Sequence, residues 1–115
     1  MGTLITAEHR AQLLDNGAAA ARGERRDALP VVKLVTLDAH ATWLLTELDP
    51  NDCDTAFGLC DLGMGAPALG HVRLSDLENI RGPQNLPISC DPHFTPRRPL
   101  SEYIRLAQAD GSIND

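Results

Sequence analysis

The sequence feature that most constrains the fold is a pair of apolar runs only three residues apart, PVVKLVTL over residues 30–37 and ATWLLTEL over residues 41–48. Both runs are rich in β-branched and other apolar residues, which favour strands. Because a three-residue connection reverses the chain at once, the two strands are expected to pair antiparallel. TAFGLCDL (55–62) and HVRL (71–74) predict two further strands of the same meander, and residues 86–90 form at most a short edge strand.

The N-terminal segment ITAEHRAQLLDNG predicts a helix. Thr6 is a suitable N-cap because its hydroxyl can accept a hydrogen bond from a free N–H of the first turn. Asn16 and Gly17 predict the end of this helix, since glycine readily adopts the left-handed conformation found after a helix C-terminus. The alanines, glycine and charged residues that follow predict a mobile connector over residues 18–29.

Two more helices are predicted after the strands. Ser75 and Glu78 stand three residues apart, as in a capping box that opens a short helix. Pro99 opens a last helix, which ends at Gly111. A run of strands with helices at its ends indicates an α+β fold: an antiparallel meander sheet of about four strands packed by an N-terminal and a C-terminal helix. The 115 residues fit a single domain over residues 1–115.

The composition limits the class of protein. One Trp, one Tyr and two Phe are too few for the stacking platforms of proteins that bind single-stranded nucleic acid. We expect no membrane span, because every apolar run is far shorter than about 20 residues, and no secretory signal. Three irregularly spaced cysteines favour the reducing cytoplasm over a disulfide framework, and no cofactor is expected. The expected core includes Val32, Leu34, Trp43, Leu45 and Phe57.

Acidic residues gather in the middle of the chain. Residues 38–96 contain nine Asp or Glu and two Arg, within a chain of net charge −6. This excess disfavours direct binding of nucleic acid there and favours a protein partner with a basic surface, while a homo-oligomer stays open. The expected partner-binding residues are Asp52, Asp54 and Asp61, which supply charge, and Met64, Pro67 and Leu69, which supply apolar contacts.

A glycine-containing loop spans residues 63–70. Its glycines, Gly63, Gly65 and Gly70, do not have the G-x-G-x-x-G spacing of a phosphate-binding loop, and no helix is predicted directly after them. They predict a connection between antiparallel strands in which glycines take positive φ angles.

Catalytic and metal-binding residues are present only as incomplete sets. The candidates for a small enzyme at this loop are Asp61, His71 and Cys60, but a nucleophile flanked by a base and an orienting group is not evident. The metal candidates are Cys60, Cys90 and His93. Zinc needs three or four ligands in tetrahedral reach, and the sequence contains no second clean pair of them, so we expect no bound metal.

Two basic clusters stand outside the acidic centre. Arg22, Arg25 and Arg26 in RGERR are the candidates for contact with DNA phosphates. Arg97 and Arg98 precede the N-terminus of the last helix, where the helix dipole disfavours positive charge. This placement makes them candidates for a fork that binds a carboxylate or a phosphate.

The segments VVKLVTLDAHATWLLTELDPND and AFGLCDLGMGAPALGHVRLSDLE resemble an uncharacterised bacterial family, one of the domains of unknown function. The most specific parts are TWLLTELDP and FGLCDLG with the glycine loop after it. The resemblance extends from LITAEHRAQLLDNG to the last helix. It implies a small accessory protein carried on plasmids and integrative conjugative elements, and it implies no catalytic residues.

The sequence therefore predicts a non-enzymatic interaction protein of a mobile genetic element. The most specific version of this prediction is an inhibitor of a host defence system, such as an anti-CRISPR or anti-restriction factor, that acts through an acidic face. Two alternatives stay open. One is a small enzyme with its site at the glycine loop. The other is a plasmid-maintenance or conjugation accessory that binds DNA through Arg22, Arg25 and Arg26.

Overall fold

A computed structural model describes residues 4–24, 27–36, 39–81 and 83–113 of the chain. Its described part contains three helices and five strands. In chain order these are α1 (Ala7–Ala21), β1 (Val32–Thr36), β2 (Thr42–Leu48), β3 (Thr55–Asp61), β4 (Ala68–Arg73), α2 (Leu74–Asn79), β5 (Ile88–Cys90) and α3 (Leu100–Asp110).

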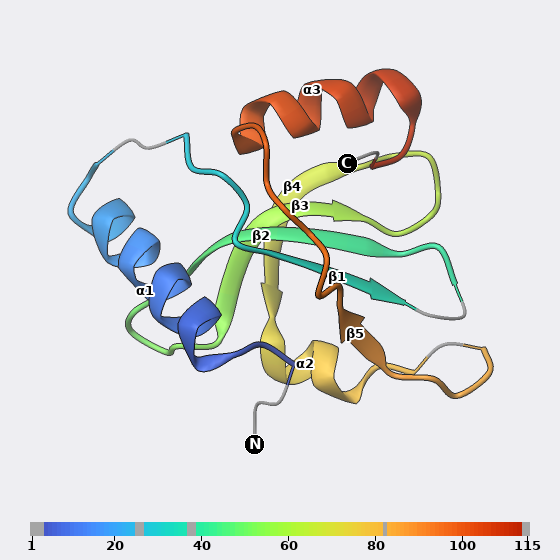
Figure 1. Ribbon diagram of the computed structural model, residues 1–115, viewed down its shortest axis with the longest axis horizontal. Coiled ribbons are helices and arrows are strands. Elements are labelled where there is room, and N and C mark those ends of the chain that lie inside the picture. The colour runs from blue at the N-terminus through green and yellow to red at the C-terminus, as the bar shows by residue number, and fades with distance from the viewer. Residues whose placement is uncertain (1–3, 25–26, 37–38, 82, 114–115) are drawn as a thin grey trace.

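The strands form one antiparallel sheet in the order β4-β3-β2-β1-β5. The predicted hairpin is confirmed, with Leu34 of β1 opposite Trp43 of β2. The predicted edge strand is also confirmed, because β5 pairs with the outer side of β1 and extends the meander to five strands. The fold is therefore α+β, with a helix at each end of the chain, as the sequence predicts (Figure 1).

Both faces of the sheet are covered by helices. Side chains of α1 and α2 pack on one face against Trp43 and Leu45, and α3 packs on the other face against Leu44 and Leu59. Since both faces are covered, four consecutive residues of β2 are buried, from position 43 to position 46. Four of the five predicted core residues are buried, but Phe57 is only half-buried, at the margin of the α3 cluster.

The N-terminal helix begins as predicted but does not end at Gly17. Thr6 caps it by accepting a hydrogen bond from the backbone N–H of His9. The helix continues to Ala21, so the first four residues of the predicted connector over 18–29 are helical. Gly17 is needed for close packing instead of a C-terminal cap: a Cβ atom at this position would lie 1.7 Å from the carbonyl oxygen of Leu48 in β2.

Strand β2 has an irregularity opposite this glycine. Its register with β3 shifts between Leu45 and Glu47, which marks a β-bulge at Thr46. The carbonyl oxygen of Thr46 accepts a hydrogen bond of 2.8 Å from Asn16 Nδ2. The Thr46 hydroxyl donates to the carbonyl oxygen of Phe57. Asn16 and Gly17 therefore dock α1 onto the bulge, which is why they do not end the helix.

The starts of α2 and α3 are held by carboxylates that are distant in sequence. The N–H and hydroxyl of Ser75, the second residue of α2, both donate to the carboxylate of Asp54. Ser101, the second residue of α3, donates in the same two ways to Asp27. The capping box predicted from Ser75 and Glu78 is thus wrong, because the Ser75 hydroxyl is a donor to Asp54 and the helix already begins at Leu74. The predicted end of α3 is confirmed: Gly111 has φ +77°.

We predict that Gly17→Ala destabilises the protein, although alanine normally stabilises a helix relative to glycine. The added methyl group would overlap backbone atoms of β2, so α1 must move away from the sheet at a cost of about 1–3 kcal/mol. The free energy of unfolding in urea measures this change. Gly70→Ala is the matched control, because a Cβ atom there meets open space. An equal effect of the two substitutions would contradict close packing at Gly17.

We also predict that Asp27→Ala lowers the free energy of unfolding by about 1 kcal/mol, the usual effect of losing an N-cap. A double-mutant cycle with Ser101→Ala tests whether this loss comes from the contact with α3. The two substitutions should be less than additive, because each removes the same side-chain hydrogen bond. Additive effects would show that Asp27 does not hold the start of α3.

Candidate functional site

The predicted glycine loop is shorter than expected. The connection between β3 and β4 covers residues 62–67, and Gly70 lies within β4. Gly63 and Gly65 have φ +79° and +76°, as predicted. Met64 is 76% exposed, and Leu69 is exposed on β4 rather than in the loop. Pro67 is buried, which does not favour the predicted contact with a partner.

Asp61 is also buried, with 4% of its surface exposed, so it contributes no charge to an exposed face. Its carboxylate accepts hydrogen bonds from the backbone N–H groups of Gly63 (2.9 Å) and Ile113 (3.0 Å). Asp61 therefore fixes the start of the loop and the C-terminal segment to β3. The sequence analysis missed this role because the partner, Ile113, is 52 positions away.

The other two predicted acidic residues, Asp52 and Asp54, lie before β3, at the opposite end of that strand from Asp61. Hydrogen bonds from the Thr55 hydroxyl and backbone lower the pKa of Asp52 to about 2. Asp54 accepts from Ser75, as described above. The predicted acidic face is thus divided, and Asp52 and Asp54 organise the turn between β2 and β3 and the start of α2.

The three catalytic candidates are not brought together. His71 lies opposite Phe57, with the two rings 5.0 Å apart. Asp61 is four residues further along β3 than Phe57, roughly 13 Å away along the strand. Cys60 packs against the cluster on the α1 face of the sheet. Burial raises the pKa of its thiol, which disfavours the thiolate that a nucleophile requires.

The metal candidates are separated as well. Cys60, Trp43, Leu34 and Cys90 form one row across β3, β2, β1 and β5. Three strand spacings place Cys60 and Cys90 about 14 Å apart. In the four described ranges, no three His, Cys, Asp or Glu side chains gather closely enough to hold a metal ion.

The basic cluster near the end of α1 falls partly outside the described residues, since Arg25 and Arg26 are among those left out. Arg22 forms an ion pair of 2.7 Å with Glu24. Within the described ranges, the helices are all too short or too polar to cross a membrane.

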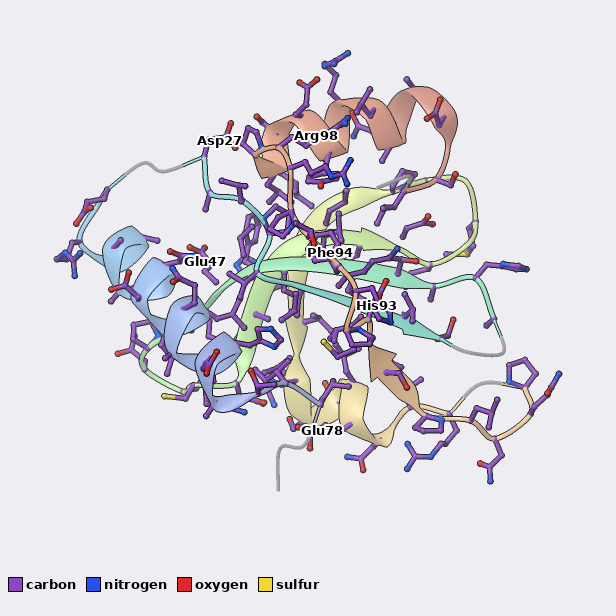
Figure 2. The ribbon with its side chains drawn as sticks, in the orientation of Figure 1. Asp27, Glu47, Glu78, His93, Phe94 and Arg98 are labelled. Carbon is purple, nitrogen blue, oxygen red and sulfur yellow. The ribbon has the colours of Figure 1, made fainter. Side chains whose placement is uncertain are left out.

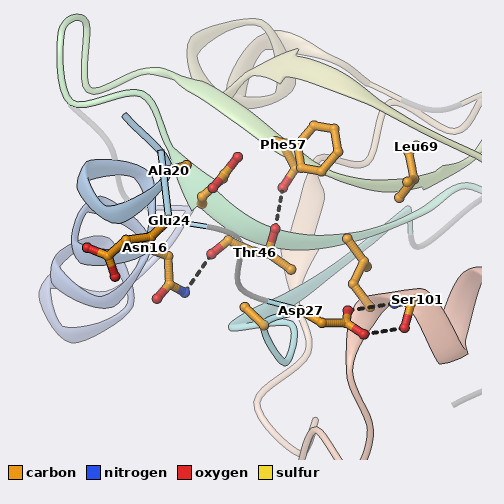
Figure 3. Close-up of a pocket in the computed structure, with 11 residues that line it drawn as sticks. Asn16, Ala20, Glu24, Asp27, Thr46, Phe57, Leu69 and Ser101 are labelled. Carbon is orange, nitrogen blue, oxygen red and sulfur yellow. Dashed lines mark hydrogen bonds between the residues drawn. The ribbon is translucent and has the colours of Figure 1, made fainter. Parts of the chain in front are cut away.

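The structure instead reveals a cavity of about 370 Å³ at the seam between α1 and α3 (Figure 3). We call it the seam cavity. Three acidic residues line it, and the described lining contains no Lys or Arg. The lining residues are Asn16, Ala20, Glu24, Asp27, Ala28, Thr46, Glu47, Phe57, Leu69, Leu100 and Ser101.

The β-bulge determines which residue of β2 faces this cavity. After the extra residue, Thr46, Glu47 becomes the register partner of Phe57, which in turn faces His71 on β4. Register partners on neighbouring strands have their side chains on the same face of a sheet. Glu47 therefore stands beside the Phe57 ring in the seam cavity, on the α3 face of the sheet.

Glu47 differs from the other two acidic residues of the cavity in its bonding. The carboxylate of Asp27 is occupied by Ser101, and that of Glu24 is paired with Arg22. Within the described part of the chain, no hydrogen bond or ion pair is formed by the Glu47 carboxylate. Burial raises the pKa of Glu47, and the nearby His71 opposes this shift more weakly. A cation entering the cavity would compensate for this loss of hydration.

Sequence reasoning missed the seam cavity, although one signal was present. Glu47 is the only charged residue in TWLLTEL, a run that is otherwise apolar or threonine. A charged residue in a strand covered on both faces must reach either solvent or a cavity. The β-bulge at Thr46 determines that Glu47 faces the cavity. This bulge is bonded to Asn16 of α1, so the sequence of the strand alone does not predict it.

We predict that Glu47→Gln stabilises the protein at neutral pH. A raised carboxyl pKa means that the folded state binds the proton more tightly than the unfolded chain. Glu47 therefore favours the folded state below its ordinary pKa of 4.5 and disfavours it once pH rises through the raised value. Urea unfolding at neutral pH should show a gain for Glu47→Gln that vanishes below pH 4.5.

Glu78→Gln controls for the removal of one negative charge, since Glu78 is half-buried on α2, outside the seam cavity. An equal gain from both substitutions at neutral pH would show that net charge, rather than the environment of Glu47, is responsible.

Comparison with known proteins identifies a family but no characterised relative. Neither the curated proteins nor the solved structures include a match to this chain. A family model described as a protein of unknown function (DUF2958) matches residues 4–114, which include all the described helices and strands. The chain belongs to the DUF2958 family.

Proposed function

We propose that this protein is a non-catalytic binding protein whose seam cavity receives a basic side chain of a protein partner. The observation that carries the proposal is the lining of the cavity: three carboxylates and several apolar side chains, with no Lys or Arg among the described lining residues. Such a site complements an Arg or Lys side chain, whose aliphatic stem packs on apolar surface while its charged end meets a carboxylate.

Glu47 is the carboxylate that best fits this role. It is half-buried and forms no ion pair in the described part of the chain. An incoming guanidinium or ammonium group would restore the interactions that Glu47 lost with water. Phe57 and Leu69 would contact the stem of the basic side chain. A volume of about 370 Å³ is at the lower end of the range for ligand pockets, which suits one side chain better than a large cofactor.

The surface beside the seam cavity also fits a protein partner. β4 is an edge strand of the sheet, and its Leu69 is 44% exposed. The preceding loop exposes 56% of Leu62 and 76% of Met64. Exposed apolar side chains next to an open strand edge are suited to burial against another protein.

We further propose that the partner belongs to a bacterial defence system and that the protein acts in the cytoplasm as mobile-element cargo. The support is the resemblance to proteins of plasmids and integrative conjugative elements, together with the net charge of −6. Nucleases that act on DNA or RNA bind it through basic surfaces. An acidic protein that occupies such a surface would exclude the nucleic acid.

A plasmid-restriction assay tests this function. Cells that carry an RNA-guided nuclease or a restriction enzyme are transformed with a targeted plasmid, with or without this protein. The protein should raise the transformation efficiency, and Glu47→Lys should remove the effect because it places a positive charge in the cavity. Binding of the purified partner should weaken at least roughly tenfold.

Glu78→Lys is the matched control, because it makes the same charge reversal on α2, away from Glu47 and Asp27 (Figure 2). It should leave inhibition and binding intact. Equal loss with both variants would assign the effect to net charge and contradict a specific role for the seam cavity. Failure of the wild-type protein against both classes of defence enzyme would contradict the inhibitor proposal.

A further inference from the structure

A second hollow lies in the segment that joins β5 to α3. It has a volume of about 260 Å³ and is lined by His93, Thr95, Arg97, Arg98 and Tyr103. Figure 2 shows His93, Phe94 and Arg98 along this segment, with Arg98 next to the start of α3. We call it the arginine pocket. Its lining differs completely from that of the seam cavity.

The arginine pocket has the opposite charge from the rest of the protein. Two of its five lining residues are arginines and one is histidine, whereas the chain as a whole has a net charge of −6. In the part of the chain that the structure describes, the guanidinium group of Arg97 forms no hydrogen bond or ion pair. The two arginines that the sequence analysis singled out as a fork therefore do line one concave site.

Tyr103 organises this pocket from the first turn of α3. It is buried, with 3% of its surface exposed. Its hydroxyl accepts a hydrogen bond from the backbone N–H of Arg97, and the guanidinium of Arg98 lies 5.6 Å from its ring centroid. The tyrosine thus fixes the backbone at one arginine and holds the side chain of the other. This ordering reduces the entropy that a ligand must overcome to engage both groups.

Two carboxylates that are close to the pocket residues in sequence, Glu102 and Asp91, already have partners. Glu102 is bonded to Arg105 and also interacts electrostatically with Arg98. Asp91 accepts a hydrogen bond from the backbone of His93 and pairs with Lys33 at 3.8 Å. The first N–H groups of α3 are also occupied, since Leu100 donates to the carbonyl of Ala28 and Ser101 donates to Asp27. A ligand in the pocket would therefore meet the arginine, histidine and threonine side chains rather than the helix backbone.

We propose that the arginine pocket binds the phosphate group of a small phosphomonoester. Guanidinium groups bind phosphate oxygens in pairs, with two parallel hydrogen bonds. A phosphomonoester carries a charge of about −1.5 to −2 at neutral pH, which two arginines neutralise better than they neutralise the single charge of a carboxylate. The hydroxyl of Thr95 and the ring of His93 supply further polar groups for the phosphate or the group that it is attached to.

A nucleic-acid strand fits these observations less well. Binding to a strand requires a row of positive charges along successive phosphates. The arginine pocket is a single concave site, and the net charge of −6 repels a polyanion at longer range. This proposal is independent of the seam cavity and does not rest on the function proposed above.

Isothermal titration calorimetry tests the proposal with four probes at constant ionic strength in chloride: glycerol phosphate, inorganic phosphate, dimethyl phosphate and a single-stranded DNA oligonucleotide. We expect saturable binding of glycerol phosphate with one site per chain, weaker binding of inorganic phosphate, and no measurable binding of the diester or the oligonucleotide. Arg97→Gln should weaken the binding of glycerol phosphate by roughly tenfold or more, because it removes charged hydrogen bonds.

Two variants keep this test interpretable. Arg97→Lys preserves the charge but not the fork, and it should give an affinity between those of the wild type and Arg97→Gln. Arg81→Gln removes an arginine that bonds to the backbone carbonyls of Glu78 and Ile80, outside the pocket, and it should leave binding unchanged. Circular dichroism checks that each variant folds.

Three results would overturn the proposal. The first is the absence of saturable binding of either glycerol phosphate or inorganic phosphate to the folded wild-type protein. The second is equal weakening by Arg81→Gln and Arg97→Gln, which would indicate general charge attraction. The third is tighter binding of the oligonucleotide than of glycerol phosphate together with its loss in Arg97→Gln, which would assign the pocket to nucleic acid.

Discussion

The contact between α1 and the bulge of β2 determines the shape of this protein more than any other. At the bulge, Thr46 turns its carbonyl oxygen away from the regular ladder, and Asn16 supplies the donor that satisfies it. Gly17 allows the helix to approach the carbonyl of Leu48 so closely that no side chain fits between them. The bulge in turn sets Glu47 opposite Phe57 and into the seam cavity. Helix packing, strand register and the acidic site therefore depend on one set of neighbouring contacts.

The remaining connections are made by carboxylates that reach across the chain. Asp54 holds the start of α2, Asp27 holds the start of α3, and Asp61 holds the C-terminal segment at Ile113. Each carboxylate accepts a hydrogen bond from a backbone N–H of a segment distant in sequence, at the start of a helix for Asp54 and Asp27 and in the C-terminal segment for Asp61. Three of the sixteen acidic residues thus hydrogen-bond to distant parts of the fold. Of these three, Asp61 is buried and presents no carboxylate to a partner.

The sequence predicted those features that local chemistry decides. The strand runs, the Thr6 cap and the left-handed Gly111 all depend on residues within a few positions of one another, and the structure confirms them. The errors occurred where a distant partner decides the outcome. Gly17 was assigned to a helix end because its contact with Leu48 is not visible in the chain, and Ser75 was assigned to a capping box because Asp54 lies 21 positions away. The seam cavity combines α1, the sheet and α3, so no single stretch of sequence contains its signal.

The two proposed sites meet at the start of α3, and this arrangement limits how each can be used. Asp27 lines the seam cavity and also bonds to Ser101, one residue after Leu100, while Tyr103 lines the arginine pocket two residues further on. A cation that binds the carboxylate of Asp27 would compete with Ser101 for it. Loss of the Ser101 contact would loosen the first turn of α3, which contains Tyr103 and so positions Arg97 and Arg98. A cation that binds the carboxylate of Glu47 would leave the contact between Asp27 and Ser101 in place. Partner binding through Glu47 is therefore compatible with an occupied arginine pocket, whereas binding through Asp27 would couple the two sites negatively.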